Sequence, residues 1–385
     1  MAFFRGPNVV TDGLVLALDA ANPKNFPEGE PTTNIFPSPV SLGSNRVTAA
    51  QIGAIFTDFT TGSFNNGPFV RLTRNVNSIP SPTTAWDFEY SNTSTGYPDG
   101  TKFAFSFYAR SIDGSTPTIK MSNPDAEAQT FNLTTQWQRF VGIFTLGIQI
   151  TGNLWIRINR SNQQWVSGSS YDISNAQMEY KTYATPFVNG SRTLWYDTSG
   201  NNNSGSLVNG PTYSSANGGI IVFDGTNDYV QVSRNTNFAF GTNDFSVDYW
   251  FNKTGSGNSA MMDCTSPGGF GFNLINNTQI FAFQSFGSSY TINCNFLYNT
   301  WNNITLIRSG GSLLSAYVNG NFVGSNNSVS ASFTSNGNEV FGINANLSTN
   351  PFPGYVSTIK IYNKSITSSE VLQNYNAQKS RFNLN

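Results

Sequence analysis

Apolar and polar residues alternate in short segments along most of the chain. In residues 102–110 (KFAFSFYAR), phenylalanine occupies every second position at first, while alanine, serine and tyrosine fill the positions between. The same period of two recurs at 136–145, 154–159, 244–251 and 301–308. A period of two places successive side chains on opposite faces and is typical of β-strands. The pattern predicts an all-β protein.

Turn residues separate these segments and predict that neighbouring strands are antiparallel. Residues 219–232 (GIIVFDGTNDYVQV) read as strand, tight turn and strand, with Asp224-Gly225 at the reversal. Asn319-Gly320 lies between two further alternating segments. Glycine after Asp or Asn favours the positive φ that a tight hairpin requires.

The final element has a different period. Thr367 and Glu370 have the spacing of a capping box, and Val371, Leu372 and Tyr375 then recur at helical spacing. We predict one short helix over about 368–378.

Turn clusters also divide residues 32–189 into strands of their own, which predicts a separate β-sandwich. Its closing segment, YDISNAQMEYKTYATPFV (171–188), contains Ala-Gln-Met-Glu followed by Ala-Thr-Pro. This segment, with 102–111 and 137–144, resembles a jelly-roll module found in phage tail and fibre proteins. Those modules are similar to carbohydrate-binding modules.

A second resemblance covers about 190–378. The segments FDGTNDYV, DFSVDYWF, NTWNNITLIR, AYVNGNFVG and FPGYVSTIKIYNKSITSSEVLQNYN follow one another in an order that resembles the laminin-G-like, concanavalin-A-like jelly roll of tailed-phage virion proteins. The opening strand, 13–19, is similar to the first strand of such domains. In those domains that strand continues directly into a Trp-x-Asp-x-Ser-Gly-Asn segment.

Here the corresponding segment, 195–201, comes about 170 residues later. The resemblance therefore implies two antiparallel β-sandwiches (jelly rolls), with one inserted in the first loop of the other. We expect residues 1–31 to form the N-terminal arm and first strand of the laminin-G-like sandwich. Residues 32–189 would form the inserted module, and 190–385 the remainder of the first sandwich.

Composition limits the chemistry. The 385 residues include no histidine, so catalytic sites that need a histidine base are excluded as usually built. The formal net charge of −1 argues against nucleic acid as a partner. Cys264 and Cys294 are too few for a disulfide-stapled scaffold; they are either bridged or two small buried side chains.

The chain shows no run of about 20 apolar residues that would span a bilayer, so no membrane partner is expected. The N-terminus also lacks the apolar segment of a signal peptide. We therefore expect synthesis in a cytoplasm without an export signal.

Glycan hydrolysis needs two suitably spaced carboxyl groups. The Glu-x-Asp-x-x-Glu pattern that would supply them on one strand face is absent. Asp87 and Glu89 lie beside a loop of the inserted module, and Asp244 and Asp248 share one strand end. No catalytic residue is assigned, and we predict a protein that is not an enzyme.

A calcium ion is the candidate ligand of the turn that contains Asp224, Asn227 and Asp228, because calcium binds carboxylate, amide and carbonyl oxygens. The alternative is that these side chains cap the backbone amides of their own turn. By similarity to carbohydrate-binding jelly rolls, Asp172 would face a structural ion in the inserted module.

Carbohydrate binding is predicted at aromatic residues that lie outside the obvious strand cores. These are Trp86, Tyr90, Tyr97 and Trp165. An aromatic face can stack on sugar C–H groups, but the same rings could instead cover a sandwich edge. The tryptophans in alternating segments are assigned to cores: Trp137, Trp155, Trp250 and Trp301.

The two resemblances imply a virion structural or adhesion protein of a tailed bacteriophage. Its expected partners are host-surface glycan, other virion proteins and further copies of itself, and its expected location is the virion. The alternatives are a secreted bacterial carbohydrate-binding adhesin and, less favoured, a glycan-cleaving enzyme.

Overall fold

The computed structural model describes residues 8–35, 56–65, 67–74, 88–91, 96–123, 128–151, 155–160, 170–265, 269–284, 287–334 and 337–384. The chain divides into two compact units. Unit 1 comprises Met1–Pro31 and Thr193–Asn385, and unit 2 comprises Thr32–Arg192. None of the helices in these ranges is long and apolar enough to cross a bilayer.

Unit 1 contains two antiparallel sheets. The first has the spatial order β15 (Thr212–Ser214), β16 (Ile220–Asp224), β27 (Pro353–Tyr362), β18 (Phe245–Lys253), β23 (Trp301–Ser309), β24 (Leu313–Val318) and β25 (Asn321–Asn326), and β1 (Leu14–Asp19) also pairs with β27. The second has the order β13 (Leu194–Trp195), β14 (Gly205–Val208), β17 (Tyr229–Val232), β26 (Glu339–Phe341), β19 (Ser259–Cys264), β20 (Phe270–Ile275), β21 (Gln279–Gln284) and β22 (Ser289–Asn293).

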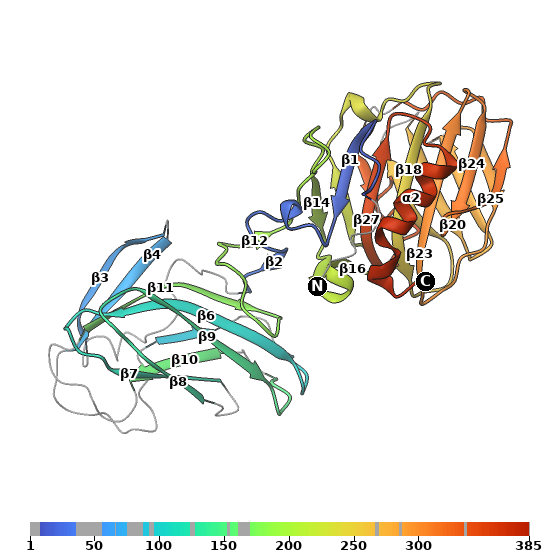
Figure 1. Ribbon diagram of the computed structural model, residues 1–385. Coiled ribbons are helices and arrows are strands. Elements are labelled where there is room, and N and C mark those ends of the chain that lie inside the picture. Colours follow the sequence, from blue (N-terminus) through green and yellow to red (C-terminus); the bar gives the residue numbers. More distant parts are fainter. Residues whose placement is uncertain are drawn as a thin grey trace, which may run out of the picture. The chain divides into compact units, whose positions relative to one another are not determined.

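Two strands that are far apart in sequence share one edge of β27. Residues 353–356 pair with β16, and residues 358–362 pair with β1, so that Asp19 lies opposite Thr358 and Leu14 opposite Tyr362. Figure 1 shows blue β1 beside red β27. The first strand of the chain therefore completes a sheet built from its last third.

The polar residues that follow Trp195 hold the other edge of β1. The Asp197 carboxylate accepts hydrogen bonds from the amides of Ala17 (2.8 Å), Ser199 (2.9 Å) and Asn203 (2.9 Å). Asn203 Nδ2 donates to the carbonyl of Val15 at 2.7 Å. This segment satisfies backbone groups that an edge strand would otherwise leave unpaired.

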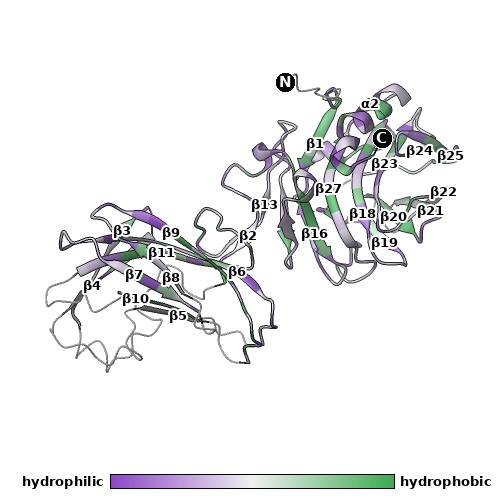
Figure 2. Ribbon diagram, turned by 60° about the horizontal axis from the view of Figure 1, so that its bottom comes forward, coloured by the Kyte–Doolittle hydropathy of each residue, from purple (hydrophilic) through white to green (hydrophobic). Residues whose placement is uncertain are grey.

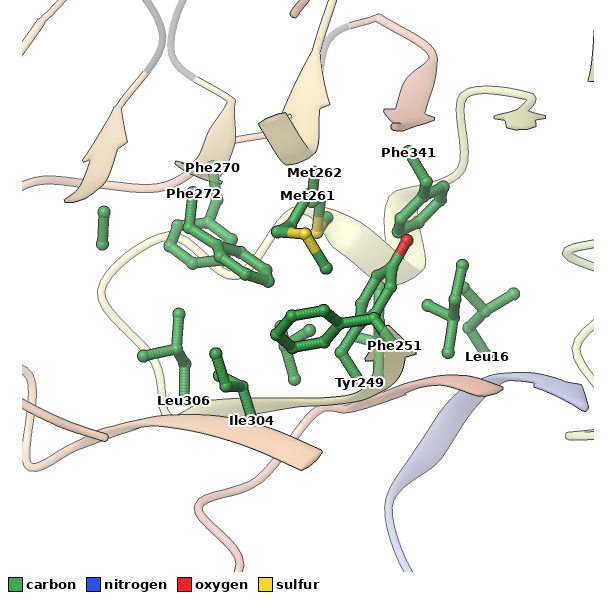
Figure 3. Packing of buried hydrophobic residues seen from close by; sticks show 14 of the residues in the cluster. Leu16, Tyr249, Phe251, Met261, Met262, Phe270, Phe272, Ile304, Leu306 and Phe341 are labelled. Atoms are coloured by element: carbon green, nitrogen blue, oxygen red, sulfur yellow. The ribbon is translucent and has the colours of Figure 1, made fainter. Parts of the chain in front are cut away.

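The core of unit 1 lies between the two sheets. Figure 3 shows side chains from β18 and β23 pointing toward those from β19 and β20, with Leu16 of β1 among them. Cys264 and Cys294 are buried and form no disulfide, and burial raises the pKa of the Cys294 thiol to about 12. Both cysteines thus act as small buried side chains.

The predicted helix is present as α2 (Ser368–Gln378). Thr367 is its N-cap, and the side chains of Thr367 and Glu370 form the reciprocal hydrogen bonds of a capping box. Short 3₁₀ segments lie at Pro23–Asn25, Ala216–Gly218, Thr236–Phe238 and Lys379–Phe382. The all-β fold class with a short C-terminal helix is confirmed.

Helix α2 covers the outer face of the first sheet in unit 1 (Figure 1). Trp250 has no exposed surface and stacks on Tyr375 of the helix (ring centroids 5.6 Å apart) and on Phe382 (4.5 Å). Beside it, Lys360 Nζ lies 3.2 Å from the Asp248 carboxylate, and both side chains are almost fully buried. The outer face therefore carries a second, partly ionic core.

Unit 2 contains a five-stranded sheet and a four-stranded sheet. The first has the order β3 (Phe56–Phe64), β4 (Gly67–Arg74), β11 (Ser170–Glu179), β6 (Lys102–Ser111) and β9 (Gln138–Thr145). The second has the order β5 (Phe88–Ser91), β10 (Trp155–Arg160), β7 (Thr118–Ser122) and β8 (Ala128–Asn132), and a short pair joins β2 (Thr32–Thr33) to β12 (Ser191–Arg192).

The phenylalanines at alternate positions of β6 form the centre of the unit 2 core. Phe103, Phe105 and Phe107 are fully buried and pack with residues of β7, β10 and β11. Figure 2 shows green and purple stretches along the strands of this unit. The period of two therefore assigned the inner face of β6 correctly.

The closing segment of unit 2, residues 171–188, is held together by side-chain hydrogen bonds. The Glu179 carboxylate accepts from Thr185 N (3.0 Å), Thr185 Oγ1 (2.6 Å) and Thr32 Oγ1 (2.5 Å). Gln177 Oε1 accepts from the amide of Val188 at 2.6 Å. The motif thus ties the segments by which the chain enters and leaves unit 2 to strand β11.

Candidate functional site

The outer face of the five-stranded sheet in unit 2 places charged and aromatic side chains in one row. The strand registers pair Arg71 of β4 with Asp172 of β11, and Asp172 with Arg110 of β6. Continuing the β6–β9 register by one residue places Trp137 opposite Arg110. Four side chains from four segments therefore lie across the sheet.

Asp172 is the centre of this row and has no exposed surface. Its Oδ1 accepts from Arg71 Nε at 2.7 Å, and its Oδ2 accepts from Arg71 Nη2 at 3.0 Å and from Arg110 Nε at 2.9 Å. Two positive charges and three hydrogen bonds stabilise the buried carboxylate. Asp172 is thus engaged by two arginines, and the structural ion implied by the resemblance stays a prediction.

Four aromatic rings lie on or next to this row. The guanidinium carbon of Arg110 lies 4.7 Å from the ring centroid of Trp137. Phe64 stacks on Trp137 with centroids 4.2 Å apart, and its ring is 5.3 Å from that of Tyr108. Phe69 contacts Trp137 edge-on at 5.8 Å. We call Phe64, Phe69, Tyr108, Arg110 and Trp137 the ring cluster.

The ring contacts show that this sheet curls toward its outer face. Strand β3 and strand β9 are four positions apart in the sheet, which corresponds to about 19 Å in a flat sheet. Nevertheless the ring of Phe64, at the end of β3, stacks on that of Trp137, next to β9. The outer face is therefore bent so that the end of β3 meets the segment next to β9.

The ring cluster stays partly open to solvent. The side chains of Arg71 and Arg110 are 27% and 29% exposed. Phe64, Tyr108 and Trp137 are half-buried. Such a mixture of rings and oriented polar groups is typical of binding sites for small ligands.

The next row of the same face adds a third arginine. The registers align Phe69, Ser174, Tyr108 and Arg139. Arg139 Nη2 donates to Ser106 Oγ at 2.9 Å and to the carbonyl of Thr185. The two rows together contain three arginines and one carboxylate, so their positive charges exceed their negative charges by two.

Of the four aromatic side chains predicted to bind carbohydrate, the structure describes one. Tyr97 is described in full and is only 5% exposed within the unit 2 core, so it does not offer an open ring face. Tyr90 lies in β5, where its backbone pairs with Ile156, but its side chain is outside the described residues. Trp86 and Trp165 are also outside them.

Trp137 departs from the core position that its alternating segment predicts. It is half-buried and belongs to the ring cluster. The alternation along the strand indicates the outer face, because Trp137 is two positions from Arg139 and therefore lies on the same side of the sheet as this charged residue. Trp250 and Trp301 are buried as predicted, and the side chain of Trp155 is outside the described residues.

The turn proposed for calcium lies at one rim of unit 1. Asp228 Oδ2 accepts from the amide of Asp224 at 3.0 Å, and Asp224 Oδ1 accepts from the amide of Thr226 at 2.7 Å. The carbonyl of Asn227 accepts from Asn209 Nδ2 at 2.9 Å. Both carboxylates therefore cap backbone amides of the turn.

Burial raises the pKa of Asp228, which is 4% exposed, whereas Asp224 and Asn227 are exposed. In the described ranges, no group of three or more histidine, cysteine, aspartate or glutamate residues is placed to hold a metal. Calcium binding at this turn stays a prediction.

The acidic pair of unit 1 considered for hydrolysis is engaged in structural contacts. Asp248 accepts from Lys360, Thr305 Oγ1 and Asn303 Nδ2 beneath α2, and Asp244 accepts from Ser365 Oγ. Of the other pair, Asp87 lies outside the described residues, as does the side chain of Glu89. Asp248 is thus committed to packing.

Residues 224–372 match the family model of the concanavalin A-like lectin/glucanases superfamily. The matched region lies entirely within unit 1 and contains most of its strands. A concanavalin A-like lectin fold is therefore supported for this part of the chain. No curated protein matches the sequence significantly.

Several solved structures are similar to part of the chain. The receptor binding domain of botulinum neurotoxin C/D mosaic serotype is 17% identical, with a TM-score of 0.41 and coverage of 48% of this chain and 48% of that one. Domain 4 of an extracellular arabinanase from Geobacillus stearothermophilus, in complex with arabinotriose, is 18% identical, with a TM-score of 0.39 and coverage of 46% and 91%. The chain thus spans about half the length of the toxin domain that it matches.

Proposed function

We propose that the chain is a non-enzymatic adhesion protein whose unit 2 binds glycan at the ring cluster. The observation that carries this proposal is the ring cluster beside the arginine-held Asp172, in which Trp137 stacks on Phe64 and contacts Arg110. The partly exposed edges of these rings can pack on sugar C–H groups, while fixed guanidinium groups donate hydrogen bonds to sugar oxygens. The lectin/glucanases match of residues 224–372 supports a carbohydrate-related role for the chain.

The absence of an assigned catalytic pair supports binding over hydrolysis. Of the carboxylates considered, the fully described pair is engaged, with Asp248 bound to Lys360. A hydrolase would need two carboxyl groups free to exchange protons with the substrate. Release of sugar from a glycan by the purified full-length chain would overturn the non-enzymatic assignment.

We place this binding activity in the virion of a tailed bacteriophage, as a fibre, tail or head-decoration component. The resemblance of 171–188 and 190–378 to modules of phage particles supports this placement. Its partners would be host-surface glycan, neighbouring virion proteins and further copies of the chain. A secreted bacterial adhesin is the alternative, and mass spectrometry of purified particles from the source distinguishes the two.

The test of glycan binding is an array of bacterial surface oligosaccharides probed with the full-length chain. We expect saturable binding to at least one glycan and loss of at least tenfold in affinity in W137A. The matched control is W137F, which keeps an aromatic ring and should retain most of the binding. A blank array with folded wild-type protein, or equal binding by W137A, would overturn the proposal.

A further inference from the structure

The orientation of Arg110 points to the chemistry of the ligand, and this inference rests on the proposed glycan-binding function. Only the Nε atom of Arg110 is hydrogen-bonded to Asp172. Its two terminal amino groups make no hydrogen bond to a described residue, and the side chain is 29% exposed. The donors that remain are therefore the pair at the end of the guanidinium group.

The position of this donor pair is fixed from two sides. Asp172 holds the Nε side at 2.9 Å, and the Trp137 ring lies 4.7 Å from the guanidinium carbon. An arginine that is held in this way loses little further rotamer freedom when it binds a ligand. Its end-on pair of N–H groups matches the two oxygens of a carboxylate.

The charge balance of the face favours the same ligand. Arg110 donates to Asp172 through Nε alone, and Arg139 in the next row bonds to a serine hydroxyl and a carbonyl oxygen and to no described carboxylate. The positive charge of these two arginines attracts anions, although the whole chain has a formal net charge of −1. We infer that the ring cluster binds an acidic glycan, whose sugar carboxylate is received by the terminal amino groups of Arg110.

The experiment compares acidic and neutral sugars that are otherwise matched. Full-length protein is titrated calorimetrically with 3′-sialyllactose and lactose, and with oligogalacturonate and its methyl ester. 3′-Sulfolactose serves as an anionic probe without a carboxylate. We expect at least one carboxylated probe to bind about tenfold or more tightly than its neutral match, because a hydrogen bond to a charged group is stronger than a neutral one. Sulfolactose binding as tight as that of the best carboxylated probe would overturn the carboxylate assignment.

Two variants localise the effect. R110Q should bring the affinity for the acidic probe close to that for its neutral match. K102Q is the matched control: Lys102 is exposed and lies on the same strand and face as Arg110, about 27 Å away, so its loss should change affinity less than twofold. If R110Q does not fold, the wild-type protein still tests the inference. Raising the salt concentration should weaken its affinity for the acidic probe and leave its affinity for the neutral probe unchanged.

The outcomes separate this inference from the function on which it rests. Equal affinity for acidic and neutral probes, or loss of acidic binding in K102Q and not in R110Q, would overturn the acidic-glycan inference while glycan binding stands. Failure of the folded protein to bind any sugar, on the array and in titration, would overturn both.

Discussion

The two units treat the outer face of a sheet in opposite ways. In unit 1, α2 covers the face, and Trp250 and the Asp248–Lys360 pair lose almost all contact with solvent. In unit 2, a tryptophan and an arginine–aspartate row occupy the corresponding position, but Arg110 and Trp137 stay partly exposed. Similar side chains therefore form a buried core in unit 1, where α2 covers them. In unit 2 they form a partly exposed surface, because no described segment covers them.

The largest expected difference concerns the two tryptophans. W250A should lower the free energy of unfolding of unit 1 by about 3–5 kcal/mol, because it leaves a cavity beneath α2. W137A should lower that of unit 2 by only about 1 kcal/mol, because the ring is already partly exposed to solvent. Denaturant titrations monitored by circular dichroism measure both. Equal losses would contradict the contrast between a covered and an open face.

The ion pairs should differ in the same direction. D248A leaves Lys360, whose side chain is 4% exposed, without its partner, and should cost about 3–5 kcal/mol. D172A should cost less, about 1–2 kcal/mol, because Arg71 and Arg110 are each more than a quarter exposed and can be hydrated. The same titrations apply, and a larger loss in D172A than in D248A would refute this ranking.

Helix α2, which covers the outer face of the unit 1 sheet, is stabilised by its N-cap residue Thr367. T367A removes the hydroxyl that accepts from the amide of Glu370 at 3.2 Å and should destabilise α2 by about 1 kcal/mol. Hydrogen exchange of residues 368–378 should accelerate accordingly. S368A, at an exposed neighbouring position, is the matched control and should leave exchange nearly unchanged. An equal effect of both substitutions would argue against the capping box.

A further prediction concerns the pH dependence of unit 1. Burial lowers the pKa of Lys253 to about 8, and its Nζ lies 5.2 Å from the Tyr298 ring centroid. Since the unfolded lysine binds a proton more readily, this residue makes stability rise from about pH 8 to pH 10.5. K253M cannot titrate, so its stability relative to wild type should fall across this window. A pH-independent difference would contradict the lowered pKa.

Alternation predicted the strands well because it depends only on neighbouring residues. It identified the inner face of β6 from Phe103, Phe105 and Phe107, and the capping box of α2 from Thr367 and Glu370. The assignment of the first strand to the laminin-G-like sandwich rested on the order of the matching segments and not on local pattern, and its pairing with β27 came only from the structure.

The open face was harder to predict because a strand does not reveal what covers it. Trp137 precedes a strand that has apolar residues on both faces, Phe140 and Phe144 inside and Val141 and Ile143 outside, so Arg139 is the one charged residue that marks its outer face. Trp250 also lies on an outer face, yet α2 buries it. Whether an outer-face tryptophan is buried therefore depends on the segment that packs over it and not on its neighbours in sequence.

The most direct test of this contrast is oxidative footprinting of the tryptophans in the full-length chain, read by mass spectrometry. We predict that Trp137 is oxidised well before Trp250, and that a saturating oligosaccharide ligand slows oxidation of Trp137 while leaving Trp250 unchanged. Oxidation of Trp250 as fast as Trp137, or no protection of Trp137 by a bound sugar, would contradict the assignment of the open face as the binding surface.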